Sequence, residues 1–133
     1  GQERLTVTST GNIGIGSSSP TVALDVNGEM KAKSISGSFN DAAAGSSLDF
    51  TTGNTQTTTY DCGSAIALSN MRDGGSYTII VTGTGTNTCT FTHTDVTGWR
   101  FLPANGARTA STHSIYTILK AGTLTYVNWQ SGF

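Results

Sequence analysis

The first third of the chain alternates apolar and polar side chains with a period of two. The alternation occurs in three short bursts, at residues 5–7, 13–15 and 22–26, which are separated by Gly11 and by a serine run that ends at Pro20. Alternation of this length is typical of half-buried β-strands. Strands this short bury too little apolar area to offset the entropy lost on ordering them, so we expect them to pair with further strands, most simply from copies of the same chain.

The C-terminal half contains longer alternating runs that are separated by turn residues. Six of them predict strands, at residues 64–70, 77–82, 88–95, 99–102, 113–119 and 124–129. Short strands at intervals of about 8 to 12 residues, without helical periodicity, are typical of a small antiparallel β-sandwich or barrel, of which we expect the sandwich. Residues 79–81 and 126–129 are apolar on both faces of their strands, so we expect a second buried surface in contacts between subunits.

These patterns divide the chain into three parts and predict an all-β protein. Residues 1–35 are expected to form one β segment and residues 60–133 a head domain. Residues 36–59 carry only three large apolar side chains and are expected to be a linker or loosely packed neck. Both Trp, all Tyr, both Cys and both His lie in the head, which therefore holds most of the side chains suited to specific recognition.

The composition is rich in small polar residues and poor in charge. Thr, Ser and Gly supply 24, 15 and 17 of the 133 residues, and only 11% of residues are charged. An average soluble domain has about 25% charged residues. So few charges indicate that neighbouring chains cover part of the surface. Gly and Ser allow close approach of backbones in the first segment, whereas the β-branched Thr favours strands.

The charge balance and the apolar runs exclude two classes of partner. Seven Lys and Arg against eight Asp and Glu provide no basic patch, so we expect no nucleic acid partner. No run approaches the roughly 18 apolar residues that a membrane-spanning helix needs, so we expect no membrane insertion.

Residues 5–32, LTVTSTGNIGIGSSSPTVALDVNGEMKA, resemble a shaft segment of trimeric phage tail fibres and tail-fibre-like bacterial adhesins. In that family GN(I/V)GIG is followed by Ser/Thr, Pro and LDVNG. The run from MRDGGSYT to the final NWQSGF is similar to the small β-sandwich heads that end some of these fibres, including those of predatory bacteria. The resemblance implies an extracellular homotrimer, on a cell surface or a virion tail fibre, with an intertwined β shaft segment followed by an antiparallel β-sandwich head.

Cys62 and Cys89 are the only cysteines. In an exported protein an even number of cysteines favours a disulfide between them. In a reducing compartment both would remain small buried hydrophobic side chains. The sequence leaves both alternatives open.

A glycan-binding site needs a flat aromatic ring beside amides, hydroxyls and a charged group with several donors, such as a guanidinium. One stretch of the head concentrates these side chains, and it supplies our candidate ligand-binding residues: Trp99, Arg100, Asn105, Arg108 and His113. As alternatives, the tryptophan fills the core and the arginines pair with acidic residues across the trimer.

Other chemistries receive little support from the residues. His93, Asp95 and His113 lack the local spacing of a metal site, so we expect no metal or cofactor. The glycines at 14 and 16 are not followed by the third glycine and helix of a phosphate-binding loop. No nucleophile elbow is present, and both Glu lie outside the head, so we expect a protein that is not an enzyme.

Together, these expectations predict that the chain forms the tip of a trimeric fibre. The head would act as a receptor-binding adhesin that recognises a surface ligand on a target cell, with a glycan as the expected ligand. Three weak sites on one trimer would gain affinity through their effective concentration. Two alternatives are a structural fibre segment without a ligand and a depolymerase that cuts surface polysaccharide.

Overall fold

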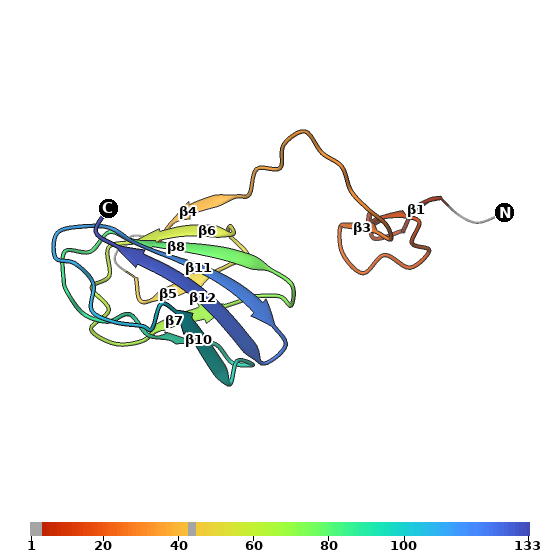
Figure 1. Cartoon of the computed structure of the whole chain (residues 1–133). Helices are drawn as coiled ribbons and strands as arrows, with labels where there is room; N and C mark the ends of the chain where they lie inside the picture. Colours follow the sequence, from red (N-terminus) through yellow and green to blue (C-terminus); the bar gives the residue numbers. More distant parts are fainter. Residues whose placement is uncertain (1–3, 43–44) are drawn as a thin grey trace. The chain divides into compact units, whose positions relative to one another are not determined.

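The computed structural model describes residues 4–42 and 45–133, and all its regular elements are β-strands. The chain divides after Ser36 into two compact units (Figure 1). The first segment expected from the sequence ends at residue 35, and the first unit ends at Ser36.

The first unit is a three-stranded sheet. Its strands are β1 (Leu5–Val7), β2 (Ile13–Ile15) and β3 (Leu24–Val26), in the order β1-β2-β3. β1 and β2 are antiparallel, whereas β2 and β3 are parallel. The three strands lie within the three bursts of alternation, so the prediction of strands at these positions is confirmed.

One face of this sheet is entirely aliphatic. The register aligns Leu5 with Ile15 and Ile15 with Val26, and likewise aligns Val7, Ile13 and Leu24. Directly paired residues share a face, so these six side chains lie together. Five of them are exposed, from 39% for Ile13 to 66% for Leu5 and Val7. Among residues 4–36 only Gly14 and Pro20 are buried, so the described part of this unit has no hydrophobic core of its own.

Gly14 permits a close approach within the chain itself. A Cβ at this position would overlap the carbonyl oxygen of Ser17. Nearby, the Ser17 hydroxyl donates to Asp25 Oδ2 at 3.3 Å, and Asn12 Nδ2 donates to the Pro20 carbonyl at 3.2 Å. The fold of this unit therefore depends on side-chain hydrogen bonds and on the absence of a side chain at Gly14, because the described residues form no apolar core here.

The described residues of the second unit form nine strands in two sheets. The larger sheet has the order β10-β12-β11-β8-β6-β4, and the smaller has the order β5-β7-β9. The strands are β4 (Phe39–Asp41), β5 (Ser47–Asp49), β6 (Thr55–Thr58), β7 (Ile66–Ser69), β8 (Ser76–Val81), β9 (Phe91–Thr92), β10 (Gly98–Leu102), β11 (Ser114–Ala121) and β12 (Leu124–Ser131).

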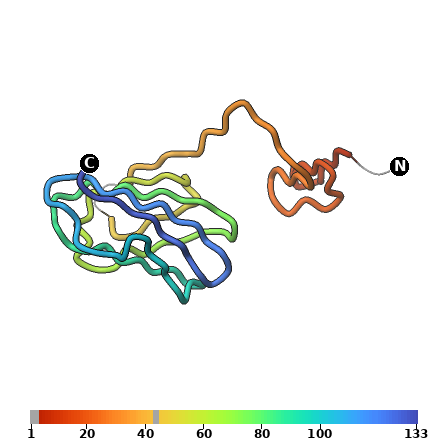
Figure 2. The backbone as a smooth tube through the Cα atoms, viewed as in Figure 1, coloured from red at the N-terminus to blue at the C-terminus, as the bar shows by residue number. Residues whose placement is uncertain are grey.

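From β4 to β9 the chain winds like a solenoid between the two sheets (Figure 2). β4, β6 and β8 lie parallel in the larger sheet, and β5, β7 and β9 lie parallel in the smaller one. The chain then adds β11 antiparallel to β8 and β12 antiparallel to β11, while β10 pairs with β12 in parallel.

The prediction of an antiparallel head was wrong for most of these strands. Among the described strands of the second unit, only β8, β11 and β12 form antiparallel pairs. Short strands and turns follow one another at similar intervals whether the chain doubles back as a hairpin or crosses to the opposite sheet. The pattern of apolar residues therefore predicts the strands without indicating their partners.

The expected linker at residues 36–59 instead supplies β4, β5 and β6. Leu48 is completely buried, and so are Gln56 and Thr58. Gln56 Nε2 donates to the Gly53 carbonyl at 3.2 Å, and Thr58 Oγ1 donates to the Gly45 carbonyl at 2.9 Å. Because hydrogen-bonded polar side chains take inward positions here, the segment packs without the apolar alternation that marks other strands.

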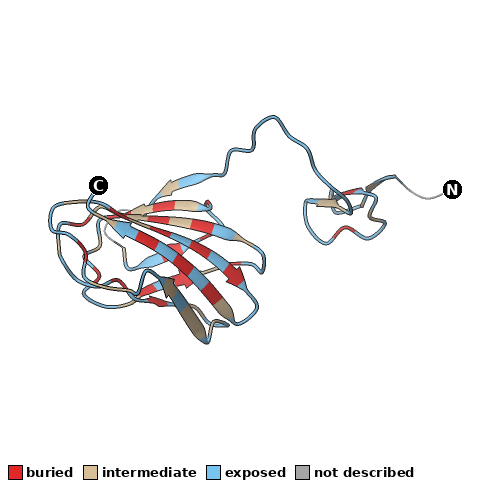
Figure 3. Ribbon diagram, in the orientation of Figure 1, coloured by how far each residue is buried: buried red, intermediate tan, exposed pale blue. Residues whose placement is uncertain are grey.

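One hydrophobic core lies between the two sheets. The larger sheet contributes the inward side chains of β8, β11 and β12, which alternate with exposed side chains in most of β11 and β12 and with partly buried ones in β8 (Figure 3). The smaller sheet contributes Leu48, Ile66, Leu68 and Phe91 from the opposite side. The outward positions of the larger sheet are thereby left for other contacts, and they include the exposed apolar side chains Leu102, Leu119 and Tyr126.

Candidate functional site

The outer face of the larger sheet carries a hollow of about 370 Å³ over its last three strands. We call it the β10–β12 hollow. Its lining residues come from β10, β11 and β12: Arg100, Phe101, Leu102, Thr117, Leu119, Tyr126, Val127 and Asn128. It therefore lies toward the β10 edge of the sheet.

Strand register explains why these side chains meet. Arg100 on β10 is paired with Tyr126 on β12, which is paired in turn with Leu119 on β11. The next outward row aligns Leu102, Asn128 and Thr117 in the same way. Neighbouring strands are about 4.8 Å apart, so each row places three side chains within reach of one small ligand.

The chemistry of the hollow combines an aromatic ring with polar groups. Tyr126 is 50% exposed and Arg100 is exposed. Thr117 has a hydroxyl that can hydrogen-bond to a ligand. The Asn128 side-chain amide donates one N–H to the Leu102 carbonyl at 3.1 Å, and its oxygen can accept a hydrogen bond from a ligand. No lining residue is acidic. This set suits a ligand with an apolar face, a polar rim and negative charge.

The structure places the predicted site residues on different surfaces. Arg100 lines the hollow, whereas Trp99 is half-buried and packs inward, with its ring centroid 5.6 Å from that of Phe91. This agrees with the alternative that Trp99 fills the core. His113 is exposed, and its backbone exchanges hydrogen bonds with Phe133. Neither Trp99 nor His113 lines the hollow.

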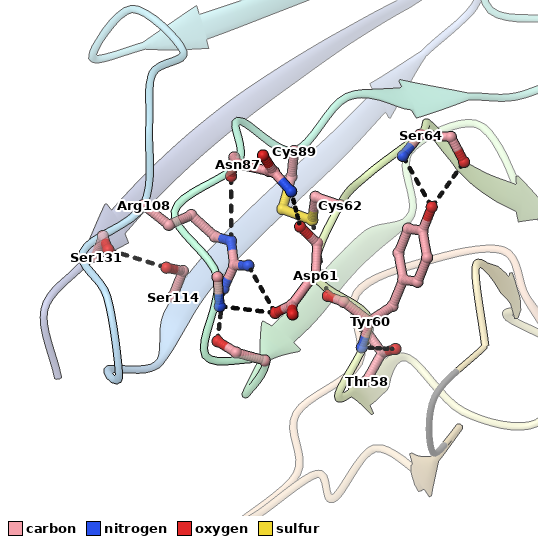
Figure 4. The surroundings of a disulfide bond; sticks show 12 residues. Thr58, Tyr60, Asp61, Cys62, Ser64, Asn87, Cys89, Arg108, Ser114 and Ser131 are labelled. Atoms are coloured by element: carbon pink, nitrogen blue, oxygen red, sulfur yellow. Dashed lines mark hydrogen bonds and ion pairs between the residues drawn. A yellow bond between two sulfur atoms is a disulfide. The ribbon is translucent and has the colours of Figure 1, made fainter.

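Arg108 is engaged inside the chain. Its side chain is buried, and its guanidinium donates to the carbonyls of Gly83 at 2.9 Å and Asn87 at 3.3 Å. The Nη2 atom also lies 3.4 Å from Asp61 Oδ1 (Figure 4). These contacts tie together three loops of the second unit, so in this structure Arg108 pairs with an acid of its own chain.

A disulfide joins Cys62 and Cys89 beside this arginine (Figure 4). Their Cα atoms are 4.9 Å apart across a sequence separation of 27 residues. Asn105, another predicted site residue, donates to the Cys89 carbonyl at 2.7 Å. The bond links the β6–β7 loop to the β8–β9 loop, so it clamps two successive turns of the winding chain. Asn105 and Arg108 therefore belong to the surroundings of the disulfide.

His93 and Asp95, which we considered as metal ligands, belong to an ion-pair cluster. His93 Nδ1 contacts Asp95, and Asp95 Oδ2 lies 3.2 Å from Lys120 Nζ. Lys120 also lies 2.6 Å from Asp73 Oδ1. The hydrogen bond that Lys120 donates to Asp73 raises the pKa of Lys120 above its usual range. Over residues 4–42 and 45–133, no three His, Cys, Asp or Glu side chains gather as metal ligands.

Burial of Tyr116 leaves its hydroxyl without a hydrogen-bond partner in the described residues. The ring stacks on Trp129 at a centroid distance of 5.6 Å and meets the edge of Phe91 at 5.2 Å. Burial raises the pKa of the phenol to about 12, although the charge of Arg108 acts in the opposite direction. The packing of the ring therefore stabilises the core, whereas the hydroxyl contributes no hydrogen bond to the stability of the fold.

We expect Tyr116→Phe to leave the free energy of unfolding unchanged or raise it by about 1 kcal/mol, because it removes a buried hydroxyl without breaking a hydrogen bond. Tyr77→Phe is the matched control, since the Tyr77 hydroxyl accepts from the Arg72 N–H at 2.5 Å. Its loss should cost about 1 to 2 kcal/mol. Urea denaturation of both variants measures the difference, and equal destabilisation would contradict this account.

Thr117, Tyr126 and Asn128 line the hollow but are not among the site residues predicted from the sequence. The apolar alternation of Tyr126 with Val127 and Trp129 instead predicts a contact between subunits. The missing information was the parallel pairing of β10 with β12, which places Arg100 beside Tyr126. The outward polar positions of β11 and β12 were the available signal, since they alternate with buried residues.

Comparison of the chain with protein-family models, with curated proteins and with solved structures finds no match in any of the three. In the described part of the chain, no helix has the length and apolar character needed to cross a bilayer.

Proposed function

We propose that the chain forms the tip of an extracellular homotrimeric fibre, borne by a cell or a virion, and that it binds a surface glycan without cleaving it. In this proposal the first unit is the end of an intertwined shaft, and the second unit is a two-sheet, sandwich-like head. The β10–β12 hollow is the ligand site. The observation that carries the proposal is the row of Arg100, Tyr126 and Leu119 on an exposed sheet face.

The hollow supports a glycan because a sugar presents C–H groups on one face and hydroxyls around its rim. The half-exposed ring of Tyr126 can cover the C–H face. Thr117 and the amide oxygen of Asn128 stand in the neighbouring row, where they can hydrogen-bond to hydroxyls. Three such sites on one trimer would bind a glycan-coated surface far more tightly than one site alone.

The aliphatic face of the first unit supports assembly. Its six side chains from β1, β2 and β3 share one side of a sheet that has no core of its own. Exposed apolar side chains in one contiguous patch favour a partner chain. A second copy of the same sheet supplies such a partner, and the resemblance of residues 5–32 to trimeric fibre shafts agrees with three copies.

The Cys62–Cys89 disulfide supports an extracellular location. Disulfides persist in oxidising environments and are rare in the cytosol, where thiols are kept reduced. The bond joins two loops of the proposed head, which is the part that would be exposed at the tip of a fibre.

A glycan array with the 133-residue chain, in the assembly it forms in solution, tests the ligand. We expect wild-type protein to bind a subset of surface glycans and Tyr126→Ala to bind them at least tenfold more weakly, which corresponds to about 1.4 kcal/mol per site. Phe39→Ala is the matched control, because Phe39 is an exposed aromatic at the opposite edge of the same sheet. Equal losses in both variants would contradict the assignment of the hollow.

The same protein distinguishes the two alternatives. A structural segment would bind neither array glycans nor whole cell envelopes. A depolymerase would release shorter chains from envelope polysaccharide during incubation, whereas we expect the chain length of the polysaccharide to stay unchanged.

A further inference from the structure

Arg100 is an exposed cation without an acidic partner in the described residues. Lys120 contacts Asp73 and Asp95, and Arg108 lies beside Asp61. Arg100 makes no ion pair of this kind over residues 4–42 and 45–133. In a chain with so few charges, an arginine placed in a hollow and left unpaired needs an explanation.

The surroundings of Arg100 strengthen its attraction for an anion. Most of the lining is apolar or aromatic, and no carboxylate competes there: Phe101, Leu102, Leu119, Tyr126 and Val127. Apolar walls lower the local dielectric, so a charge pair formed among them is stronger than one in open water. The planar guanidinium can bind both oxygens of a carboxylate or phosphate at once.

We propose that the ligand is an acidic glycan, in which a sugar ring packs on Tyr126 and an adjacent carboxylate or phosphate is bound by Arg100. This inference rests on the proposed function and narrows its ligand class. Because Arg100 and Tyr126 are paired on adjacent strands, the acidic group and the sugar ring would lie side by side across β10 and β12. A neutral sugar would leave the guanidinium without a partner, so the site discriminates against it.

The test uses an array of matched glycans that share a backbone and differ in one substituent: a uronic or sialic carboxylate, a phosphate, or neither. We expect the wild-type chain to bind acidic members at least tenfold more tightly than neutral ones. Raising the salt concentration to about 0.5 M should reduce this preference, because exposed charges are then screened within a few ångströms. The carboxylate and phosphate arms show which oxyanion the site takes.

Two substitutions connect the preference to Arg100. Arg100→Gln should abolish the preference for acidic glycans, whereas Arg100→Lys should keep part of it, because lysine retains the charge but not the planar fork. Arg72→Gln is the matched control, since Arg72 is exposed, also forms no ion pair in the described residues, and does not line the hollow. That variant should bind like wild type.

The outcomes separate the two proposals. If neutral glycans bind as tightly as acidic ones, or if Arg100→Gln keeps the preference, the acidic-ligand inference is wrong while glycan binding stands. If no glycan of any class binds, the proposed function fails and the inference fails with it. If hydrogen exchange shows that β10 becomes protected only as protein concentration rises, a second copy occupies the hollow and both proposals for this surface are overturned.

Discussion

Replacing Cys62 and Cys89 together by alanine is expected to lower the free energy of unfolding by about 3 to 4 kcal/mol. The disulfide closes a loop across a separation of 27 residues, and the entropy it removes from the unfolded chain corresponds to this amount. It also clamps the two loops that hold the Arg108 guanidinium, so its loss should loosen that site as well. Urea denaturation at fixed protein concentration measures the change.

Reduction provides the matched control for this prediction. A thiol reductant should destabilise the wild-type protein by a similar amount and leave the Cys62→Ala/Cys89→Ala variant unaffected. Unchanged unfolding midpoints for both the variant and the reduced wild-type protein would contradict a stabilising disulfide.

Introducing aspartate at Ile13 and Ile15 is expected to dissociate the proposed trimer. Both side chains lie in the middle strand of the aliphatic face, where they are flanked by β1 on one side and β3 on the other. Burying two unpaired carboxylates in a contact between copies costs several kcal/mol per group, which exceeds what so small a sheet recovers. Light scattering should therefore give about three times 13.7 kDa for wild type and 13.7 kDa for the variant.

Ser18→Asp is the control for dissociation. Ser18 is exposed in the loop that follows β2 and lies outside the aliphatic face. We expect this variant to keep the wild-type mass. A mass of 13.7 kDa for the wild-type protein itself would show that the aliphatic face does not assemble the chain.

Local alternation predicted the strands that carry apolar side chains on one face. β1, β2 and β3 lie within the expected ranges, and β8, β11 and β12 begin and end within two residues of theirs. In contrast, β6 was missed because its buried positions are Gln56 and Thr58. Their burial depends on hydrogen-bond partners at Gly53 and Gly45, which a local pattern of hydrophobicity does not contain.

The candidate site was only partly predictable for a similar reason. The sequence indicates Arg100 as a charged group beside the aromatic Trp99, and Arg100 does line the hollow. The aromatic residue beside it in space is Tyr126, which lies on a strand that follows β11. Side chains from different strands meet through pairing and register, and register depends on the whole sheet. The selection of Arg108 and Asn105 was based on residue type, whereas their hydrogen bonds place them around the disulfide.

The position of β12 in the larger sheet has a consequence for the order of folding. β12 follows β11 in the chain, yet it lies between β10 and β11, and among the described strands β10 joins the sheet through β12 alone. The edge strand that carries Arg100 therefore cannot pair until β12 has been made and inserted. A chain that lacks β12 would present the winding strands and the disulfide without the hollow, so binding competence depends on this insertion.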